Sequence, residues 1–367
     1  MPKTILILTA QFGAGHISAA NAIKDALLEK EKDLNIIIQN FINIGAPKMN
    51  KPMIKIYENN TKYTPGLYNY YYYLKKSFNS KYDISTKIYT PKLIEYILDK
   101  SPNLIISTFP QAAACVDIFK EKYPKIDIPT ITVITDVVDS MEWVYPTTNM
   151  YFVPSMEIKN RFVQRGMSPT KIKVTGVPIS KNFYCKEKLK VDNKYRLLLL
   201  GGGRGLFDVD EDFMYWIDSF LNDYKDKIEL TIVTGSNSKL FYKLTKEKPL
   251  INIQVLGFVK DMYNLIKNYD LMISKPGGAT LFESIQSQTP IIVRNPKVGQ
   301  EIENGKFIVD KGIGILYQDE DNLKEIFYKL ASNEFDSMIE FMQKNISEFK
   351  KTIYPQNISD YILELIK

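Results

Sequence analysis

The chain repeats one pattern twice: a short run of branched apolar residues leads into a glycine-containing turn, and a helical pattern follows. In the first half TILILT (4–9) precedes GAG at 13–15, and in the second half RLLLL (196–200) precedes GGG at 201–203. Such runs are typical of buried strands, and strands that alternate with helices form parallel sheets with right-handed crossovers. The sequence therefore predicts an α/β chain with two doubly wound domains.

The same alternation continues between these points. We expect further strands at 36–39, 104–107, 130–134, 150–153, 230–233, 252–256, 271–274 and 290–293, and helices at 17–30, 90–100, 111–123 and 155–165. Residues 177–195 are polar, rich in lysine and suited to a linker. The closing stretch, 336–367, is expected to form one or two amphipathic helices interrupted at Pro355.

Composition excludes several classes of protein. No apolar run reaches the roughly 18–20 residues of a membrane-spanning helix. Cys115 and Cys185 are too few for a disulfide framework or a four-cysteine zinc site, which favours a reducing compartment.

Tyrosine and lysine are concentrated in one segment. Of the 24 tyrosines, 10 lie at 48–100 together with 10 lysines and 4 acidic residues. This mixture is compatible with a nucleic-acid surface, an anionic membrane surface or ordinary solvated faces.

His16 is the only histidine of the chain. It follows the first predicted strand, at the carboxyl edge where doubly wound folds bind ligands. Imidazole removes a proton from a hydroxyl near neutral pH, so His16 is a candidate general base. The alternative is a helix-start histidine bonded to nearby backbone. A single histidine excludes metal sites that need several histidines.

Two glycine turns in the second half are suited to a diphosphate. Residues 201–205 (GGGRG) and 275–280 (KPGGAT) each follow a predicted strand, and the second opens a helix that carries Glu283. Exposed backbone N–H groups at such turns bind phosphate, although glycine also serves in ordinary tight connections. The acidic run at 208–212 (DVDED) is compatible with a metal–nucleotide site. We favour the simpler interpretation, a negatively charged first helical turn.

The order of short motifs along the chain is distinctive. The chain resembles the monogalactosyl- and monoglucosyl-diacylglycerol synthase group of glycosyltransferases, especially the bacterial processive diacylglycerol glucosyltransferases, and is related to the N-acetylglucosaminyltransferase of peptidoglycan lipid intermediates. The resemblance rests on ILILTAQFGAGH (5–16), NLIISTFP (103–110), TVITD (132–136), YFVPS (151–155), KIKVTGVPI (171–179), VTGSN (233–237), VLGFV (255–259), SKPGGATLFES (274–284) and VGQEIEN (298–304).

The resemblance implies two Rossmann-like domains that face each other across a cleft, the GT-B architecture. Residues 1–182 would form the acceptor and membrane-side domain, residues 183–340 the nucleotide-sugar donor domain, and residues 341–367 helices that pack back on the N-terminal domain. The implied reaction is inverting transfer of a hexose from UDP-hexose to a lipid hydroxyl, on diacylglycerol or glycosyl-diacylglycerol. The resemblance implies neither a metal ion nor another cofactor.

Family roles transfer to matching positions. His16 and Asp136 would be catalytic, His16 as the base and Asp136 as an orienting group. Phe258 and Val259 would frame the uracil, and Glu283 would bind the ribose. Gln300 and Glu301 would bind the sugar hydroxyls, with Asn304 nearby. The diphosphate would be surrounded by Gly202, Gly203, Gly277, Gly278 and Ala279. The other implied donor-binding residues are Gly15, Gly235, Pro276 and Thr280.

The same resemblance places the tyrosine-rich segment against an anionic membrane. Tyr63, Tyr68, Lys75 and Lys76 would form the membrane and acceptor surface of a peripheral protein on the cytoplasmic face of the cell membrane, and no nucleic-acid partner is expected. Asp139 and Glu142 replace a pattern in which relatives usually carry histidine, and they predict an unusually acidic acceptor edge.

The sequence leaves other points open. Glucose, galactose and N-acetylglucosamine remain alternatives as the donor sugar, and the acceptor, the number of sugars added and the oligomeric state are not specified. The competing functions are a nucleotide-sugar 2-epimerase and a non-catalytic nucleotide-sugar-binding protein. One histidine argues against the epimerase, whose sites typically need several acids and histidines around the sugar.

Overall fold

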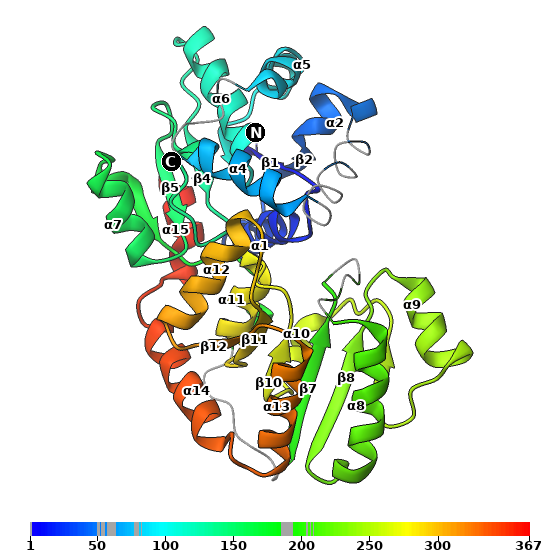
Figure 1. The fold of residues 1–367 in the computed structure, drawn as a ribbon. Helices are drawn as coiled ribbons and strands as arrows, with labels where there is room; N and C mark the ends of the chain where they lie inside the picture. Colours follow the sequence, from blue (N-terminus) through cyan, green and yellow to red (C-terminus); the bar gives the residue numbers. More distant parts are fainter. Residues whose placement is uncertain are drawn as a thin grey trace. The chain divides into compact units, whose positions relative to one another are not determined.

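The computed structural model describes residues 2–49, 52, 56, 64–76, 81, 83–184, 194–202, 205, 207 and 209–367. These residues fall into two compact units, which are described separately (Figure 1). The first unit comprises Met1–Lys181, Lys297–Gln300 and Thr352–Lys367, and the second comprises Asn182–Pro296 and Glu301–Lys351.

The first unit contains a six-stranded parallel sheet in the order β2-β1-β3-β4-β5-β6. Its strands are β1 (Thr4–Thr9), β2 (Asn35–Asn40), β3 (Leu104–Ser107), β4 (Thr130–Val133), β5 (Met150–Val153) and β6 (Ile172–Val174). Its helices and turns are α1 (Gly15–Lys30), α2 (Phe41–Gly45), η1 (Pro47–Met49), α4 (Pro65–Lys76), α5 (Ile84–Lys100), α6 (Pro110–Lys122), η3 (Met141–Trp143), α7 (Met156–Gln164), η4 (Pro169–Lys171), η7 (Pro355–Asn357) and α15 (Ile358–Glu364).

Both faces of this sheet are buried. Alternate residues of β1 point to opposite faces: Ile5 and Ile7 pack in one apolar cluster, and Leu6 and Leu8 pack in another. The first cluster includes residues of α1 and α15, and the second includes residues of α5 and α6. A parallel strand covered on both sides reads as a continuous apolar run, which explains why TILILT has no polar alternation.

The second unit contains another six-stranded parallel sheet, in the order β12-β11-β10-β7-β8-β9. Its strands are β7 (Tyr195–Leu200), β8 (Ile228–Val233), β9 (Gln254–Leu256), β10 (Leu271–Ile273), β11 (Ile291–Arg294) and β12 (Gly314–Tyr317). Its helices are α8 (Glu211–Tyr224), α9 (Ser238–Tyr242), the π-helical turn η6 (Lys243–Glu247), α10 (Met262–Ile266), α11 (Gly278–Gln286), α12 (Gly299–Asp310), α13 (Glu320–Ala331) and α14 (Asp336–Lys350). The single-turn η5 (Lys181–Phe183) and the first residues of α12 lie where the chain passes between units.

The predicted α/β class with two doubly wound sheets is confirmed. Each predicted strand lies within two residues of an observed one, and β6 and β12 were not predicted. Helix α5 begins at Ile84 rather than Thr90, because Pro91 lies inside the helix instead of in its first turn. In the part of the chain that the structure describes, no helix is long and apolar enough to cross a membrane.

The closing segment is divided between the units. Helix α14 packs in the core of the second unit through Ile339 and Met342, so the expectation that all of 341–367 packs on the N-terminal domain is corrected for this helix. Helix α15 packs on α1 in the first unit, where Ile358 and Ile362 share a cluster with Ile23. Its end is also fixed at the sheet, because Lys3 donates to the carbonyl oxygen of Ile366. The break near Pro355 is confirmed by the turn η7.

We predict that Ile362→Ala destabilises the first unit by about 2–5 kcal/mol, because it leaves a cavity at a fully buried position between α15 and α1. Chemical denaturation of a Trp216→Phe background, followed by the fluorescence of Trp143, measures this unit alone. The control is Ile84→Ala, at a position that is 78% exposed. Equal shifts in the two variants would contradict the packing of α15.

Candidate active site

The first sheet brings three chain segments together at its carboxyl edge. Strand β1 pairs with β2 on one side and with β3 on the other, so the crossovers leave β1 in opposite directions there. In doubly wound folds this topological switch point is where ligands bind. His16 follows β1, Thr108 follows β3, and Thr135 follows β4, which places all three side chains at this edge.

Hydrogen bonds anchor one atom, Nδ1, of the His16 imidazole. Its Nδ1 lies 2.9 Å from the carbonyl oxygen of Thr108 and 2.8 Å from the hydroxyl oxygen of Thr135. A carbonyl oxygen only accepts hydrogen bonds, so in the neutral ring Nδ1 carries the proton and Nε2 keeps its lone pair. The Thr108 hydroxyl in turn donates to the His16 carbonyl oxygen at 3.2 Å. The ring therefore has one anchored nitrogen and one basic nitrogen.

The surroundings of His16 favour the neutral imidazole. Burial lowers the pKa of His16 below its ordinary value of 6.5, although the Asp136 carboxylate and the Thr108 carbonyl act in the opposite direction. The Phe109 ring lies edge-on at 4.9 Å between centroids, and the buried Trp143 lies at 6.5 Å. At neutral pH this ring is a ready proton acceptor. Asp136 affects it through charge, and the Nδ1 contacts come from Thr108 and Thr135.

The structure corrects the predicted acidic edge at Asp139. Asp139 is buried, and its two carboxylate oxygens lie 3.1 Å from Lys76 Nζ and 2.6 Å from an Arg165 guanidinium nitrogen. Burial alone would raise the pKa of Asp139, but Lys76 and Arg165 hold it below its ordinary value. The charge of Asp139 is therefore compensated inside the unit. Lys76, predicted for a membrane surface, has a structural ion pair in this arrangement.

The second sheet has the same kind of switch point, between β7 and β10. These strands are neighbours in register, with Ile273 opposite Leu199, and each runs into a glycine turn. Gly202 adopts a positive φ of 65°, and a Cβ added there or at Gly277 would meet no atom closer than 4.0 Å. Backbone N–H groups at both turns are thus approachable by a ligand at the carboxyl edge.

Helix α11 begins at the second of these turns. Gly277 is its N-cap and offers no capping side chain, and Gly278, Ala279 and Thr280 form its first turn. The positive end of the helix dipole makes this turn favourable for an anion. The fully buried Asn304 donates from its side-chain nitrogen to the Pro276 carbonyl oxygen at 2.8 Å. Asn304, expected near the sugar, holds the turn in place.

Glu283 lies on the same helix and has an altered acidity. Burial alone raises the pKa of Glu283 to about 8, so its carboxyl group is protonated at neutral pH. A neutral carboxyl group both donates and accepts hydrogen bonds. Acids with a perturbed pKa cluster at functional sites, which makes Glu283 a candidate.

The turns after β8 and β9 complete this edge. Gly235 has a positive φ of 56°, which favours glycine for conformational reasons. Asn237 caps α9 by accepting from Leu240 N–H at 3.0 Å, and it donates to the Gly205 carbonyl oxygen at 3.2 Å. It therefore joins the turns that follow β7 and β8. Phe258, after β9, is 73% exposed, and Val259 is half-buried.

The other predicted residues have these positions. Gly15 is the first residue of α1, and Gln300 and Glu301 lie half-buried in the first turn of α12. Gly203 and Tyr63 lie outside the described residues, as do the side chains of Tyr68 and Lys75.

The acidic run at 208–212 begins a helix, as the simpler interpretation predicts: Asp210 caps α8 by accepting from Phe213 N–H at 2.8 Å. Within the described ranges, no cluster of three histidine, cysteine or acidic side chains is arranged for a metal ion.

Sequence reasoning missed Thr108, Thr135 and Asn237. Thr108 lies in NLIISTFP and Thr135 in TVITD, so the motifs were noted while their contacts to His16 were not. The Thr108 contact uses a backbone carbonyl, which has no residue-specific signal. The switch-point topology is the information that could have paired these segments in advance.

Comparisons with known proteins identify the family and agree with the fold. The family model described as monogalactosyldiacylglycerol (MGDG) synthase matches residues 16–179, and the model described as glycosyltransferase family 28 C-terminal domain matches residues 197–355. The fold is also similar to the crystal structure of Acinetobacter baumannii MurG, with a TM-score of 0.60 and 14% identity over 100% of this chain and 99% of that one. Together these matches define a two-domain glycosyltransferase.

Curated relatives specify the family further. The chain is 31% identical to the processive diacylglycerol beta-glucosyltransferase of Staphylococcus haemolyticus over 91% of this chain and 86% of the relative. It is 30% identical to that of Staphylococcus aureus strain MRSA252 over 98% and 93% of the two chains. The chain belongs to the processive diacylglycerol beta-glucosyltransferase family.

We predict that His16 titrates with a pKa below 6.5. In a Trp216→Phe background, Trp143 is the only tryptophan, and its emission is expected to fall as the neighbouring imidazole becomes protonated. A pH titration of this emission gives the pKa directly. His16→Gln is expected to abolish the step. A midpoint at or above 6.5 would contradict the burial of the ring.

A second prediction concerns Glu283. Its folded-state pKa of about 8 exceeds the ordinary 4.5, so its contribution to stability is complete below 4.5 and is lost as the pH rises through 8. Glu283→Gln keeps the neutral form and is expected to raise the unfolding midpoint of the second unit at about pH 9 and to change it little at about pH 5. Trp216 fluorescence in a Trp143→Phe background reports this unit. An equal gain at both pH values would refute the assignment.

Proposed function

We propose that this chain transfers a hexose, with inversion, from UDP-hexose to the hydroxyl group of diacylglycerol or glycosyl-diacylglycerol. The single observation that carries the acceptor half is the anchored His16 imidazole, whose Nδ1–H is held by Thr108 and whose Nε2 keeps its lone pair. The relatives named above supply the substrate class.

The proposed reaction is a single displacement at the anomeric carbon of the donor sugar. As the acceptor oxygen bonds to the anomeric carbon, Nε2 of His16 takes the hydroxyl proton, and the bond from that carbon to the phosphate oxygen breaks. UDP leaves with the electron pair, and the imidazolium is stabilised by the nearby charge of Asp136. Attack opposite the leaving group inverts the anomeric centre.

The donor half rests on the second unit. The first turn of α11, with the N–H groups of Ala279 and Thr280, would receive the diphosphate and its developing charge. Glu283, as a neutral acid, would donate to one ribose hydroxyl and accept from another. The exposed Phe258 and the neighbouring Val259 would contact the uracil, and Gln300 and Glu301 would contact the sugar. No metal is required for this arrangement.

We further propose that the chain acts as a peripheral protein on the cytoplasmic face of the cell membrane. Helix α4 supports this, because Tyr70, Tyr73 and Leu74 are exposed to solvent while Tyr72 is buried. Tyrosine favours the headgroup region of a bilayer, and exposed apolar groups gain from contact with it.

The deciding experiment incubates the purified chain with radiolabelled UDP-glucose or UDP-galactose and vesicles that contain diacylglycerol, and separates the lipids by thin-layer chromatography. We expect labelled glycolipid, with and without EDTA. His16→Ala is expected to lower turnover by about 100-fold or more, because the general base is lost.

The other outcomes are equally informative. Near-normal turnover in His16→Ala would remove His16 from the mechanism. Epimerised UDP-sugar in the absence of acceptor would instead establish the isomerase, and UDP binding without turnover would establish the non-catalytic binding protein. Loss of activity with EDTA would refute the metal-free reaction.

A further inference from the structure

The segment between Asp139 and Thr147 carries Trp143 to the side of the His16 ring. Trp143 is 3% exposed and belongs to the single turn η3, Met141–Trp143. One turn has little stability of its own. Its position must therefore be set by contacts with the surrounding elements, and the structure shows three of them.

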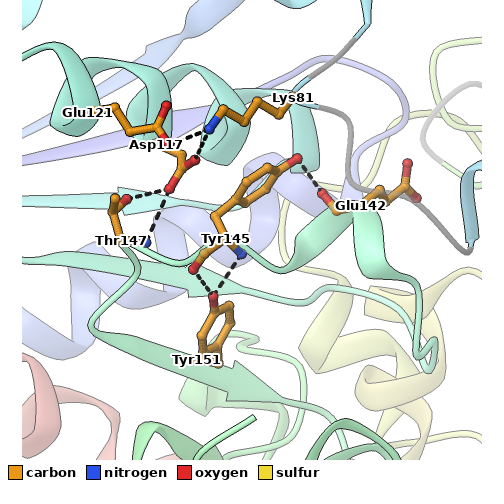
Figure 2. A network of polar contacts seen from close by, with 7 residues as sticks. All are labelled: Lys81, Asp117, Glu121, Glu142, Tyr145, Thr147 and Tyr151. Carbon is orange, nitrogen blue, oxygen red and sulfur yellow. Dashed lines mark hydrogen bonds and ion pairs between the residues drawn. The ribbon is translucent and has the colours of Figure 1, made fainter. Parts of the chain in front are cut away.

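The first contact is a hydroxyl group that binds both backbone groups of one residue. Tyr151, on β5, accepts from the Tyr145 N–H at 3.0 Å and donates to the Tyr145 carbonyl oxygen at 2.6 Å (Figure 2). The Tyr145 hydroxyl in turn donates to the carbonyl oxygen of Glu142 at 2.8 Å. This chain of bonds runs from the sheet to the residue next to Trp143.

The second contact is the carboxylate of Asp117 on α6. It is almost fully buried, and one of its oxygens accepts from the Thr147 N–H at 3.2 Å and from the Thr147 hydroxyl at 2.6 Å. The other oxygen lies 3.3 Å from Lys81 Nζ, which also pairs with Glu121 (Figure 2). Burial opposes the charge of Lys81, but Glu121 and Asp117 raise its pKa above the ordinary value.

The third contact lies at the opposite end of the segment. Asp139 is held there by Lys76 from α4 and by Arg165 after α7. The Arg165 guanidinium also donates to the Asp139 carbonyl oxygen at 2.6 Å. The segment is thus fixed at both ends by buried carboxylates and in the middle by a tyrosine hydroxyl.

Stability alone is a weak explanation for this arrangement. Removing a carboxylate such as Asp117 from water is costly, and an apolar pair of similar volume often stabilises a protein equally well. An apolar pair, however, does not orient the backbone groups next to it. Hydrogen bonds to Thr147 and Tyr145 determine where the backbone of the segment lies.

The His16 ring also needs neighbours with fixed positions, because they determine where its Nε2 atom lies. The contacts of Nδ1 with Thr108 and Thr135 fix one atom of the ring and leave the position of Nε2 to be set by its neighbours. Phe109 restricts this rotation from one side, with rings at 88°, and Trp143 contributes a second aromatic surface at a tilt of 40°. A displaced Trp143 would let Nε2 move while the hydrogen bond at Nδ1 remained.

We propose that Tyr151 and Asp117 are positioning residues for the acceptor half-reaction, which act by holding Trp143 against the His16 ring. The inference rests on the proposed function for its kinetic consequence only. Its structural consequence, a fixed environment of Trp143 and His16, is measurable whatever the chain's substrate.

The first test is Tyr151→Phe, which removes one hydroxyl and leaves the ring. In the Trp216→Phe background we expect a shifted Trp143 emission and a His16 titration midpoint closer to 6.5, because the ring becomes more hydrated. Turnover is expected to fall by about 10-fold to 100-fold, the scale of a misplaced catalytic group, with the KM for UDP-hexose unchanged.

The matched control is Tyr269→Phe in the second unit. It also removes a buried hydroxyl, which donates to Thr231 at 2.6 Å, and it is expected to lower stability without changing turnover or the His16 midpoint. If Tyr151→Phe changes only the unfolding midpoint, as the control does, the positioning role is refuted.

The second test is a cycle on the Asp117 pair. Lys81→Met removes the cation that pairs with the Asp117 carboxylate. Asp117→Asn removes the negative charge but keeps one side-chain oxygen that can accept the hydrogen bonds from Thr147. We expect each single variant to shift the His16 midpoint, and the double variant Asp117→Asn with Lys81→Met to shift it less than the sum. Unshifted midpoints in all three would overturn the proposal.

The two proposals fail in different ways. Absence of glycolipid with the unaltered chain would refute the proposed function and leave the fluorescence tests intact. Glycolipid synthesis by the unaltered chain, with turnover and midpoint unaffected by Tyr151→Phe, would refute this inference alone.

Discussion

Both sheets are parallel and buried on their two faces, and this constraint places the chemistry. A strand such as β1, whose residues alternate between two apolar clusters, has no side chain available for a substrate. Polar groups are accommodated only where strands end. The carboxyl edge of the first sheet therefore assembles His16, Thr108 and Thr135 from three separate crossovers, and the edge of the second assembles the turns at Gly202 and Gly277.

The same constraint explains what could be predicted. Runs that are buried on both faces, such as 4–9, 104–107 and 150–153, coincide with strands residue for residue. Strands β6 and β12 were missed, because each lies at the end of a sheet and carries an interrupting residue, Lys173 in one and Gly314 in the other. His16 was found because it is unique. Thr108 was not, because its contribution is a carbonyl oxygen that every residue possesses.

Charge was the least predictable property. Asp139 and Glu142 made the acceptor segment acidic when counted along the chain, yet the partners that compensate Asp139 come from α4 and from the residue after α7. A count of nearby residues cannot register such pairs, since they depend on how helices pack against the segment. Lys76 depends on packing in the same way, because a lysine of a basic, tyrosine-rich helix pairs with Asp139 of the acceptor segment.

Burial acts on the two central ionisable groups in opposite directions and leaves both neutral. It lowers the pKa of His16, so the ring can accept a proton at neutral pH, and it raises the pKa of Glu283 to about 8, so the acid keeps its proton. A carboxylate beside the first turn of α11 would repel a nucleotide diphosphate and would compete for the same N–H groups. A neutral Glu283 avoids this repulsion and retains both hydrogen-bonding functions. Desolvation thus favours a neutral base in one unit, against the opposing charge of Asp136, and an anion-compatible acid in the other.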